Sequence, residues 1–500
     1  MNISIRPWYL IVCCALLLQS CNRNKNTGVK TNNGNINERP NIVILYGDDQ
    51  GTLDLGCYGT NDIATPHLDK LASQGLKFTQ AYAHTVCCPS RAALLTGRAP
   101  QRGGVNSWTS CNPNDMDGRV MDLNEVTLAE VLKDEGYKTA LIGKWHLGAR
   151  DTHTPLDQGF DYFFGFRGGF IDYYSHRFLH AGWQKPQFHD LYRNRAEVYE
   201  GDTYFPDIQV KEATRFIEEN KNDNFFLYMA FNLPHYPEQP DSSYTERYKD
   251  LPWPRRSYAP MITTMDDRIG KVLESIEKQG LSENTIVLYM SDNGHSTEDY
   301  YNWGNSYGGN GGGGYAGKWR GAKGSFFEGG LRVPCIISYP NKFPANQERN
   351  QVITNMDWLP TICDVLNINQ PKNKLDGKSI LPIIMDDNET SPHEVLHFMW
   401  QHMWAVKRGD WKLIFRGHDT TGKFSEHPEK DFFMPEYYLA RLSDDNPEEI
   451  NYAELYPSIV KELRHLHEIW AKDVFKNSGY PDPNKETIQN KSTAKGTIKL

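Results

Sequence analysis

Acidic side chains stand just beyond two apolar segments of this chain, and their types suit a divalent cation. Asp48 and Asp49 come after the segment NIVILY. Asp292 and Asn293 come after a second segment, TIVLYM. All four side chains offer oxygen ligands and three carry charge, a set that Ca²⁺ or Mg²⁺ prefers and zinc does not. A single Asp-Asp pair after a strand is more often a turn or a helix cap, but the second pair favours a metal site.

Basic side chains and histidines occupy similar places. Lys144 and His146 follow the apolar segment TALIG, and His235 follows NFFLYMA. Lys144 lies between a glycine and a tryptophan, and Lys323 lies among small and aromatic residues in WRGAKGSFFEGGLRVP. Such surroundings are unusual for a lysine on a solvated face. Fixed ammonium groups beside a divalent cation predict a site for a tetrahedral oxyanion that has several oxygens to share.

Two adjacent cysteines, Cys87 and Cys88, precede Pro-Ser-Arg in a chain that has nine cysteines in all. The cysteines form no C-x-x-C motif and no paired framework, so neither a zinc site nor a disulfide scaffold is indicated. The pair therefore either fills space in the core or supplies a nucleophile.

Five short apolar segments alternate with helical patterns and are expected to be the strands that position these groups. They span residues 41–46, 139–143, 224–230, 285–290 and 333–339. Strands that are apolar on both faces predict a parallel or mixed sheet that is covered by helices on both sides. Ligands of such sheets bind beyond the carboxyl ends of the strands, which is where the Asp, Lys, His and Asn side chains stand.

Helical signals lie between these segments, and the pattern changes after residue 380. Thr127 and Glu130 form a capping box at the start of one helix, with Gly136 as its C-cap. The segment HEVLHFMWQHMWAVKRGDWKLIFRG predicts an antiparallel strand pair with a Gly-Asp turn, and residues 457–474 predict one amphipathic helix. We therefore predict an α/β fold with a large mixed, mostly parallel sheet sandwiched by helices. A smaller C-terminal α+β subdomain is built on a short antiparallel sheet and one helix.

The N-terminus is typical of an exported protein. Arg6 precedes an apolar run at 8–18, which is shorter than the ~20 residues that span a bilayer, and Ser20 precedes Cys21 as in a bacterial lipobox. We expect a periplasmic or cell-surface protein held to the membrane only by a lipid on Cys21; an ordinary signal with a chance cysteine is the alternative. The predicted parts are a lipoprotein signal peptide (1–20), a flexible tether (21–38), the α/β domain (39–380), the C-terminal subdomain (381–476) and a polar tail (477–500).

Composition narrows the class further. The chain has 500 residues and a formal net charge of -9, which argues against a general nucleic-acid binder. An anionic substrate remains compatible with this charge, because a local pocket can be positive on an acidic protein. The Gly-rich segment 304–317 lacks the context of a dinucleotide site and the Lys-Ser/Thr ending of a P-loop, so it is predicted to be a mobile loop near the site.

Ordered motifs give the chain a family resemblance. Cys87-Cys88-Pro89-Ser90-Arg91, continued by AALLTG, is similar to the C-x-P-S-R-x-x-x-x-T-G signature of the formylglycine-dependent (type I) sulfatases of the alkaline phosphatase superfamily. GYKTALIGKWHLG resembles the second signature of that family. RPNIVILYGDDQG, SDNGHS and KGSFFEGGLRVP match its other landmarks in the family's order. The resemblance covers residues 39–475, nearly the whole mature chain.

The resemblance implies roles for the residues singled out above. A maturation enzyme would convert Cys87 to Cα-formylglycine (3-oxoalanine), with Cys88 at a variable position. The metal ligands would be Asp48, Asp49, Asp292, Asn293 and the modified Cys87, binding Ca²⁺ or, in its place, Mg²⁺. The groups around the sulfate and the aldehyde hydrate would be Arg91, Lys144, His146, His235 and Lys323. His295, in SDNGHS, would contact sulfate or sugar, or else support another ligand.

The chemistry that the resemblance implies needs more than a thiol. One hydroxyl of a hydrated aldehyde attacks sulfur, and deprotonation of the other expels sulfate and regenerates the aldehyde. His235 is the candidate acid for the departing sugar oxygen, and His146 is the candidate base for the second hydroxyl. The candidates for a sugar subsite are His84, just upstream of Cys87, and Trp400, His402 and Trp404 in the predicted C-terminal strands. Core packing is the alternative for the aromatic rings.

The expected substrate is a sulfated carbohydrate, with terminal sulfated galactose or N-acetylgalactosamine favoured. The first alternative is a phosphate or phosphonate ester hydrolase of the same superfamily, which two lysines around an oxygen-only site disfavour. The second is a non-catalytic sugar-binding lipoprotein, which the intact set of candidate residues disfavours.

Overall fold

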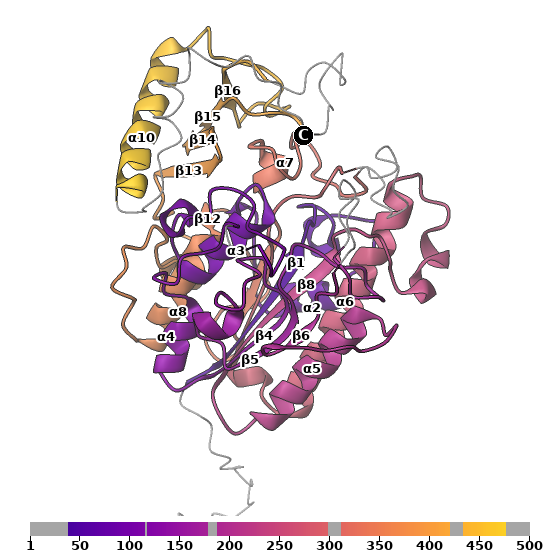
Figure 1. Ribbon diagram of the computed structural model, residues 1–500. Helices are drawn as coiled ribbons and strands as arrows, with labels where there is room; N and C mark the ends of the chain where they lie inside the picture. Colours follow the sequence, from indigo (N-terminus) through magenta and orange to yellow (C-terminus); the bar gives the residue numbers. More distant parts are fainter. Residues whose placement is uncertain (1–38, 116–117, 179–187, 299–311, 421–433, 477–500) are drawn as a thin grey trace, which may run out of the picture. The chain divides into compact units, whose positions relative to one another are not determined.

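The computed structural model describes residues 39–115, 118–178, 188–298, 312–420 and 434–476 (Figure 1). The predicted signal peptide (1–20), Cys21, the tether (21–38) and the polar tail (477–500) lie outside the described residues, as do residues 304–311 of the Gly-rich segment. Among the helices in these ranges, none has the length and apolar character needed to cross a bilayer.

A ten-stranded mixed sheet forms the centre of the described chain, in the order β11-β2-β10-β9-β1-β8-β4-β5-β6-β7. Its parallel middle consists of β9 (Thr285–Ser291), β1 (Asn41–Asp48), β8 (Phe225–Pro234), β4 (Lys138–Lys144) and β5 (Tyr162–Phe166). The flanking strands are β10 (Cys335–Ser338), β2 (Leu76–Phe78), β11 (Gln347–Arg349), β6 (Tyr192–Arg193) and β7 (Ala196–Glu197). The five apolar segments of the sequence all lie in this sheet, which confirms the predicted mixed, mostly parallel arrangement.

The middle strands are buried on both faces because helices cover both faces. Every residue of β1 is buried. Ile42, Ile44 and Tyr46 belong to one core cluster, and Val43 and Leu45 belong to the other, as expected when successive side chains point to opposite faces of a strand. The sheet therefore separates two apolar cores.

Each core is closed by its own set of helices (Figure 1). One core contains side chains of α2 (Pro66–Ser73), α5 (Phe205–Glu219) and α6 (Arg255–Lys278). The other contains side chains of α3 (Cys87–Thr96), α4 (Leu128–Asp134), α8 (Trp358–Leu366) and α9 (Leu381–Met385). The predicted capping box of α4 is present: the Thr127 side chain accepts from Glu130 N–H and the Glu130 carboxylate accepts from Thr127 N–H. Gly136, with φ of 87°, follows the end of this helix.

The C-terminal part is an antiparallel sheet of four strands, which confirms the predicted short antiparallel sheet; the segment expected to form a strand pair supplies three of the four strands. The strands are β13 (Val395–Trp400), β14 (Met403–Arg408), β15 (Trp411–Phe415) and β16 (Tyr437–Arg441). The sequence indicates only the Gly-Asp turn of this segment. A second, two-residue turn lies between β13 and β14, where Gln401 adopts a φ of 56°. Helix α10 (Pro457–Phe475) packs on this sheet, as predicted. A separate two-stranded sheet joins β3 (Ala81–Tyr82) to β12 (Ile353–Thr354).

A buried charge cluster ties the C-terminal sheet to the short helix α7 (Glu328–Leu331). Lys412 of β15 donates to Glu328 Oε1 at 2.8 Å and also pairs with Glu448, and all three side chains are fully buried. The second oxygen of Glu328 accepts from Tyr82 Oη at 2.7 Å and from Arg332 Nε at 2.8 Å. This cluster therefore links α7 to the C-terminal sheet and to Tyr82 of β3.

Candidate active site

The carboxyl ends of the parallel strands bring the predicted acidic residues together. Asp48 is the last residue of β1, and Gly47 pairs in register with Ser291 at the end of β9. Asp292 therefore emerges beside Asp48 and Asp49. Asp49 adopts a left-handed φ of 67°, and its N–H donates to Asp292 Oδ1 at 3.1 Å, which ties the two strand ends together. All three carboxylates are buried.

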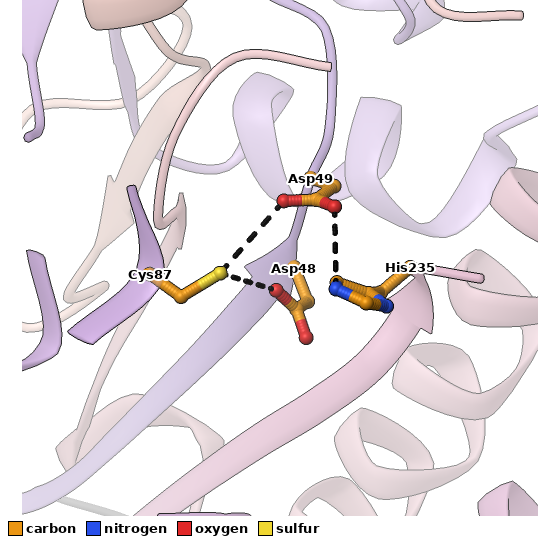
Figure 2. Close-up of side chains that lie close together, drawn as sticks. All are labelled: Asp48, Asp49, Cys87 and His235. Carbon is orange, nitrogen blue, oxygen red and sulfur yellow. Dashed lines mark hydrogen bonds and ion pairs between the residues drawn. The ribbon is translucent and has the colours of Figure 1, made fainter. Parts of the chain in front are cut away.

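Cys87 and Cys88 begin helix α3 and face different surroundings. Cys87 Sγ lies 3.5 Å from Asp48 Oδ1 and 3.9 Å from Asp49 Oδ1 (Figure 2). Cys88 belongs to an apolar core, and its Sγ donates to Ser107 O at 3.5 Å. Burial, with Asp292 nearby, raises the pKa of the Cys87 thiol well above its ordinary value. As a plain thiol, Cys87 would be protonated and a weak nucleophile at neutral pH.

Three cations approach the three carboxylates. Arg91, one turn along α3 from Cys87, donates to Asp292 Oδ2 at 2.7 Å. Lys144 Nζ donates to Asp48 Oδ2 at 2.7 Å and is fully buried. The geometry of Lys144 depends on Gly143, because a Cβ there would lie 1.8 Å from the carbonyl oxygen of Ala230 in the adjacent strand.

Lys323 joins the third carboxylate to His235. Lys323 Nζ donates to Asp49 Oδ2 at 2.8 Å and lies 3.3 Å from His235 Nε2. Burial alone would lower the pKa of Lys323, but the charges of Asp49 and the other nearby acidic groups outweigh burial. The pKa of Lys323 therefore lies well above its ordinary value. Glu298, which the sequence analysis did not identify, accepts from the same ammonium group at 3.2 Å. Glu298 follows SDNGHST in the loop after β9, and only its short separation from Asp292 could have indicated it.

Both nitrogens of the His235 imidazole have partners. His235 Nδ1 lies 2.7 Å from the carbonyl oxygen of Tyr236, which can only accept, so Nδ1 carries the proton. The neutral ring then presents Nε2 as an acceptor toward Lys323 and lies 3.6 Å from Asp49 Oδ2 (Figure 2). Burial and the charge of Lys323 lower the pKa of His235 well below its ordinary value. In this arrangement Lys323 and His235 share one proton.

His146 lies at the side of the site and is linked to it through Trp108. The imidazole of His146 stacks on Trp108 at 6.2 Å between ring centroids, and Lys323 Nζ lies 6.0 Å from the centre of the same indole. His146 Nε2 is 3.8 Å from Cys111 Sγ, and its Nδ1 has no hydrogen-bond partner among the described residues. Burial and Lys144 lower the pKa of His146 well below its ordinary value. Sequence reasoning missed Trp108, which lies in a loop without a strand-end signal.

The remaining candidates divide between the site and the core. His295 is buried next to the site, and its carbonyl oxygen accepts from Lys323 N–H at 2.9 Å. Trp400 contacts Trp108 edge to face at 5.9 Å, so it lies beside the site. Trp404 instead stacks on His467 of α10 at 4.0 Å inside the C-terminal core. Trp404 therefore takes the core-packing alternative, whereas Trp400 lies where the predicted sugar subsite would be.

The residues present fit a hard cation. Ligand atoms of Asp48, Asp49, Cys87 and His235 all lie within 4.8 Å of one another. Asn293 Nδ2 donates to Asp49 Oδ1 at 2.7 Å, while Asn293 Oδ1 is buried with no hydrogen-bond partner in the described part of the chain. An unpaired amide oxygen beside carboxylates is a typical ligand for Ca²⁺ or Mg²⁺. His235 adds a nitrogen to this group that the sequence-predicted metal set does not contain.

Known proteins are similar to this chain in sequence and in fold. A family model described as Sulfatase matches residues 40–368. An arylsulfatase of Hemicentrotus pulcherrimus is 32% identical over 76% of this chain and 68% of its own length. The N-acetylgalactosamine-6-sulfatase of Canis lupus familiaris is 32% identical over 75% of this chain and 72% of its own length. The crystal structure of Ps i-CgsB in complex with k-i-k-neocarrahexaose is 26% identical, covers 90% of this chain and 96% of its own, and has a TM-score of 0.75.

Proposed function

This chain belongs to the type I sulfatases, a family of sulfuric ester hydrolases within the alkaline phosphatase superfamily. From that premise we propose that it removes sulfate from a sulfated carbohydrate. One observation carries the proposal: the buried Cys87 lies against two carboxylates, and three buried cations approach the same group of acids. Such a site can hold a divalent cation and a tetrahedral anion side by side.

We propose that Cys87 acts after conversion to formylglycine by a maturation enzyme. The hydrated aldehyde would supply one hydroxyl that attacks sulfur and a second whose loss of a proton expels sulfate. Two observations support this assignment. Asp48 and Asp49 lie beside Cys87 Sγ, so residue 87 is next to the proposed cation site. Burial raises the pKa of the unmodified thiol, so the plain cysteine would stay protonated and react poorly. Cys88 faces the apolar core and takes no part.

Asp48, Asp49, Asp292 and Asn293 would hold Ca²⁺ beside residue 87, with Mg²⁺ as the alternative ion. The cation would lower the energy of negative charge on the attacking oxygen. The unpaired Oδ1 of Asn293 and the oxygen-rich set support this choice. Arg91, by its bond to Asp292 Oδ2, fixes the orientation of that carboxylate.

Proton transfer falls to two groups that both lie near Trp108. Lys323 and His235 share a proton in the present geometry, so the pair, with Lys323 as its proton-bearing member, would protonate the departing sugar oxygen. The sequence-based assignment of His235 alone as the acid is thereby extended to a pair. His146 is neutral and has an unpaired Nδ1, as the base for the second hydroxyl requires.

The substrate is proposed to be a terminal sulfated galactose or N-acetylgalactosamine. Trp108 is 39% exposed and Trp400 lies against it, so aromatic faces are available for a sugar ring at the edge of the site. The names of two relatives support a sugar of this kind: one is an N-acetylgalactosamine-6-sulfatase and the other was crystallised with a neocarrahexaose. Lys144 and Lys323 would bind the sulfate oxygens.

Two measurements test the function. Mass spectrometry of the peptide that contains residue 87, after co-expression with a maturation enzyme, should show an aldehyde in place of the thiol. The matured enzyme should hydrolyse an aryl sulfate and leave the matching aryl phosphate intact. An unmodified thiol would contradict the nucleophile, and preferential phosphate ester hydrolysis would contradict the reaction. A panel of defined sulfated mono- and disaccharides would then test the sugar.

Export by a lipid anchor is a separate proposal. Residues 1–20 would be removed, Cys21 would be acylated, and the tether at 21–38 would join it to the enzyme, whose parts at 39–380 and 381–476 precede the tail. Fractionation of cells that produce the wild type and Cys21→Ala should place the first in membranes and the second in soluble exported material. Equal partition of the two would contradict the anchor.

A further inference from the structure

One more acidic side chain lies at the candidate active site, outside the group of carboxylates that would hold a cation. Glu298 Oε2 accepts from Lys323 Nζ at 3.2 Å. The Glu298 side chain is 35% exposed, so a substrate can reach it. Asp49, which accepts from the same ammonium group, is only 2% exposed. A substrate that binds at Lys323 therefore meets the charge of Glu298.

The pocket next to this contact is small and acidic. Glu298 and Glu238 line it together with Asp49 and His235. Its free volume is about 10 Å³, which is about the space that one water molecule needs. A hydroxyl group of a sugar is of that size. A second anionic group at the same place would have to approach two carboxylates.

The carboxylate of Glu298 is held in a fixed orientation. Ser296 Oγ donates to Glu298 Oε2 at 2.9 Å and accepts from Glu298 N–H at 3.2 Å. Thr297 Oγ1 donates to the carbonyl oxygen of Thr420 at 2.9 Å, which anchors the same segment. The bonds from Lys323 and Ser296 both end on Oε2, so Oε1 has no hydrogen-bond donor among the described residues. A carboxylate oxygen only accepts, so Oε1 suits a hydroxyl donor and repels an anion.

The position of Lys323 limits which group of the substrate can meet Glu298. In the proposed reaction the ammonium group of Lys323 contacts the departing sugar oxygen and Glu298 at once. The group at Glu298 therefore lies within about 6 Å of that oxygen, the span of two hydrogen bonds. A hydroxyl group close to the sulfated carbon satisfies this limit.

We propose that Glu298 is a specificity-determining residue. It accepts a hydrogen bond from a free hydroxyl group beside the sulfated position and rejects sugars in which that group carries a second sulfate. Glu238, in the same pocket, adds to the repulsion. A protein can favour one substrate by placing a repulsive group against another. The proposal rests on the proposed sulfatase function and narrows the substrate to a sugar with one sulfate among neutral neighbours.

Positioning of Lys323 is the alternative role for Glu298. In that case, loss of the Glu298 charge would act on the ammonium group and not on the sugar. Glu298→Gln would then change kcat/KM by the same factor for every substrate. The ratio of kcat/KM between a monosulfated and a disulfated sugar therefore separates the two roles, whatever the variant does to turnover itself.

The test uses the full matured enzyme and the methyl β-galactosides with 4-sulfate, 6-sulfate, 3,4-disulfate and 4,6-disulfate. The wild type should hydrolyse at least one disulfate about tenfold less efficiently than the matching monosulfate, as expected for two unit charges ~6 Å apart near a protein surface. Glu298→Gln keeps the size of the side chain and should remove most of this discrimination. Glu246→Gln is the matched control, because it removes the same charge from a side chain that is 79% exposed, and it should keep the wild-type ratio.

A binding measurement separates this proposal from the hydrolysis. In a Cys87→Ala background, calorimetry should show that Glu298→Gln tightens binding of the discriminated disulfate about tenfold relative to the monosulfate, with melting temperatures as the check on folding. Discriminating binding without turnover in the matured enzyme would contradict the hydrolysis and still support the role of Glu298. Equal handling of mono- and disulfates by the wild type, an equal effect of Glu298→Gln on both, the same change in Glu246→Gln, or binding of none of the probes would overturn the proposal.

Discussion

Acid should weaken the packing of α10 on the C-terminal sheet through His467, which is buried, and His397, which is partly buried. His467 is 2% exposed and stacks on Trp404, and neither of its ring nitrogens has a hydrogen-bond partner in the described ranges. Burial lowers the pKa of His467 to about 3 and the pKa of its neighbour His397 to about 4. Protonation therefore favours the unfolded chain, in which both groups titrate near pH 6.5.

The magnitude follows from linkage. Above pH 6.5 both histidines are neutral in the folded and the unfolded chain, so they cost no stability. As the pH falls from 6.5 toward their folded-state pKa values, the unfolding free energy decreases. Between pH 7.5 and pH 5.5, His467 should cost about 1.4 kcal/mol of unfolding free energy, and His397 should cost about the same. His467→Phe keeps the stacked ring on Trp404 and cannot be protonated. Relative to the wild type, this variant should gain about 1.4 kcal/mol on acidification across that interval.

Guanidinium unfolding of the wild type and the variant at the two pH values, followed by tryptophan fluorescence, measures this difference. His465→Phe is the matched control, because His465 lies on the same helix with a side chain that is 70% exposed. The control should show no pH-dependent gain. An equal effect of His467→Phe at both pH values would refute the reasoning, as would a gain of the same size in the control.

Three further outcomes follow from the site and the buried charges. Cys87→Ala should abolish aryl sulfate turnover, whereas Cys88→Ala should keep most of it, and the opposite ranking in a turnover assay would refute the assigned register. Removal of divalent cations with a chelator should lower both activity and melting temperature, with recovery on addition of Ca²⁺; unchanged melting and activity would argue against a resident cation. Lys412→Met should lower the unfolding free energy by about 3–5 kcal/mol, because Glu448 would remain buried without its cation and Glu328 would keep only Arg332 of its two cations. Denaturant unfolding measures that loss, and Lys412→Met combined with Glu448→Gln should recover part of it.

Strand ends were the most predictable part of the site. Apolar runs without alternation identify β1 and β9 as interior strands, and parallel neighbours place Asp48 and Asp292 at one edge without further information. The helices on both faces follow from the same argument. The physical reason is that a strand buried on both faces has apolar residues at every position, which is visible in the sequence as an unbroken apolar run.

Loop residues could not be placed in this way. Trp108 and Glu298 reach Lys323 from loops whose conformation depends on tertiary contacts, and no periodic pattern marks them. Trp400 and Trp404 lie on adjacent strands, yet only the position of α10 decides that Trp404 enters the core. Strand β16 was missed because it is a five-residue segment far from its partner in sequence.

The Glu328 cluster limits how this protein can be recombined with its relatives. Glu328 follows the loop of Lys323 by five residues, and its charge is balanced from the C-terminal sheet by Lys412. A chimera that exchanges the C-terminal sheet must therefore bring a matching cation at the position of Lys412. Without it, the buried Glu328 would keep Arg332 but lose its second cation, and this loss would disturb the loop that presents Lys323. A working chimera is therefore expected to exchange α7 together with the C-terminal sheet.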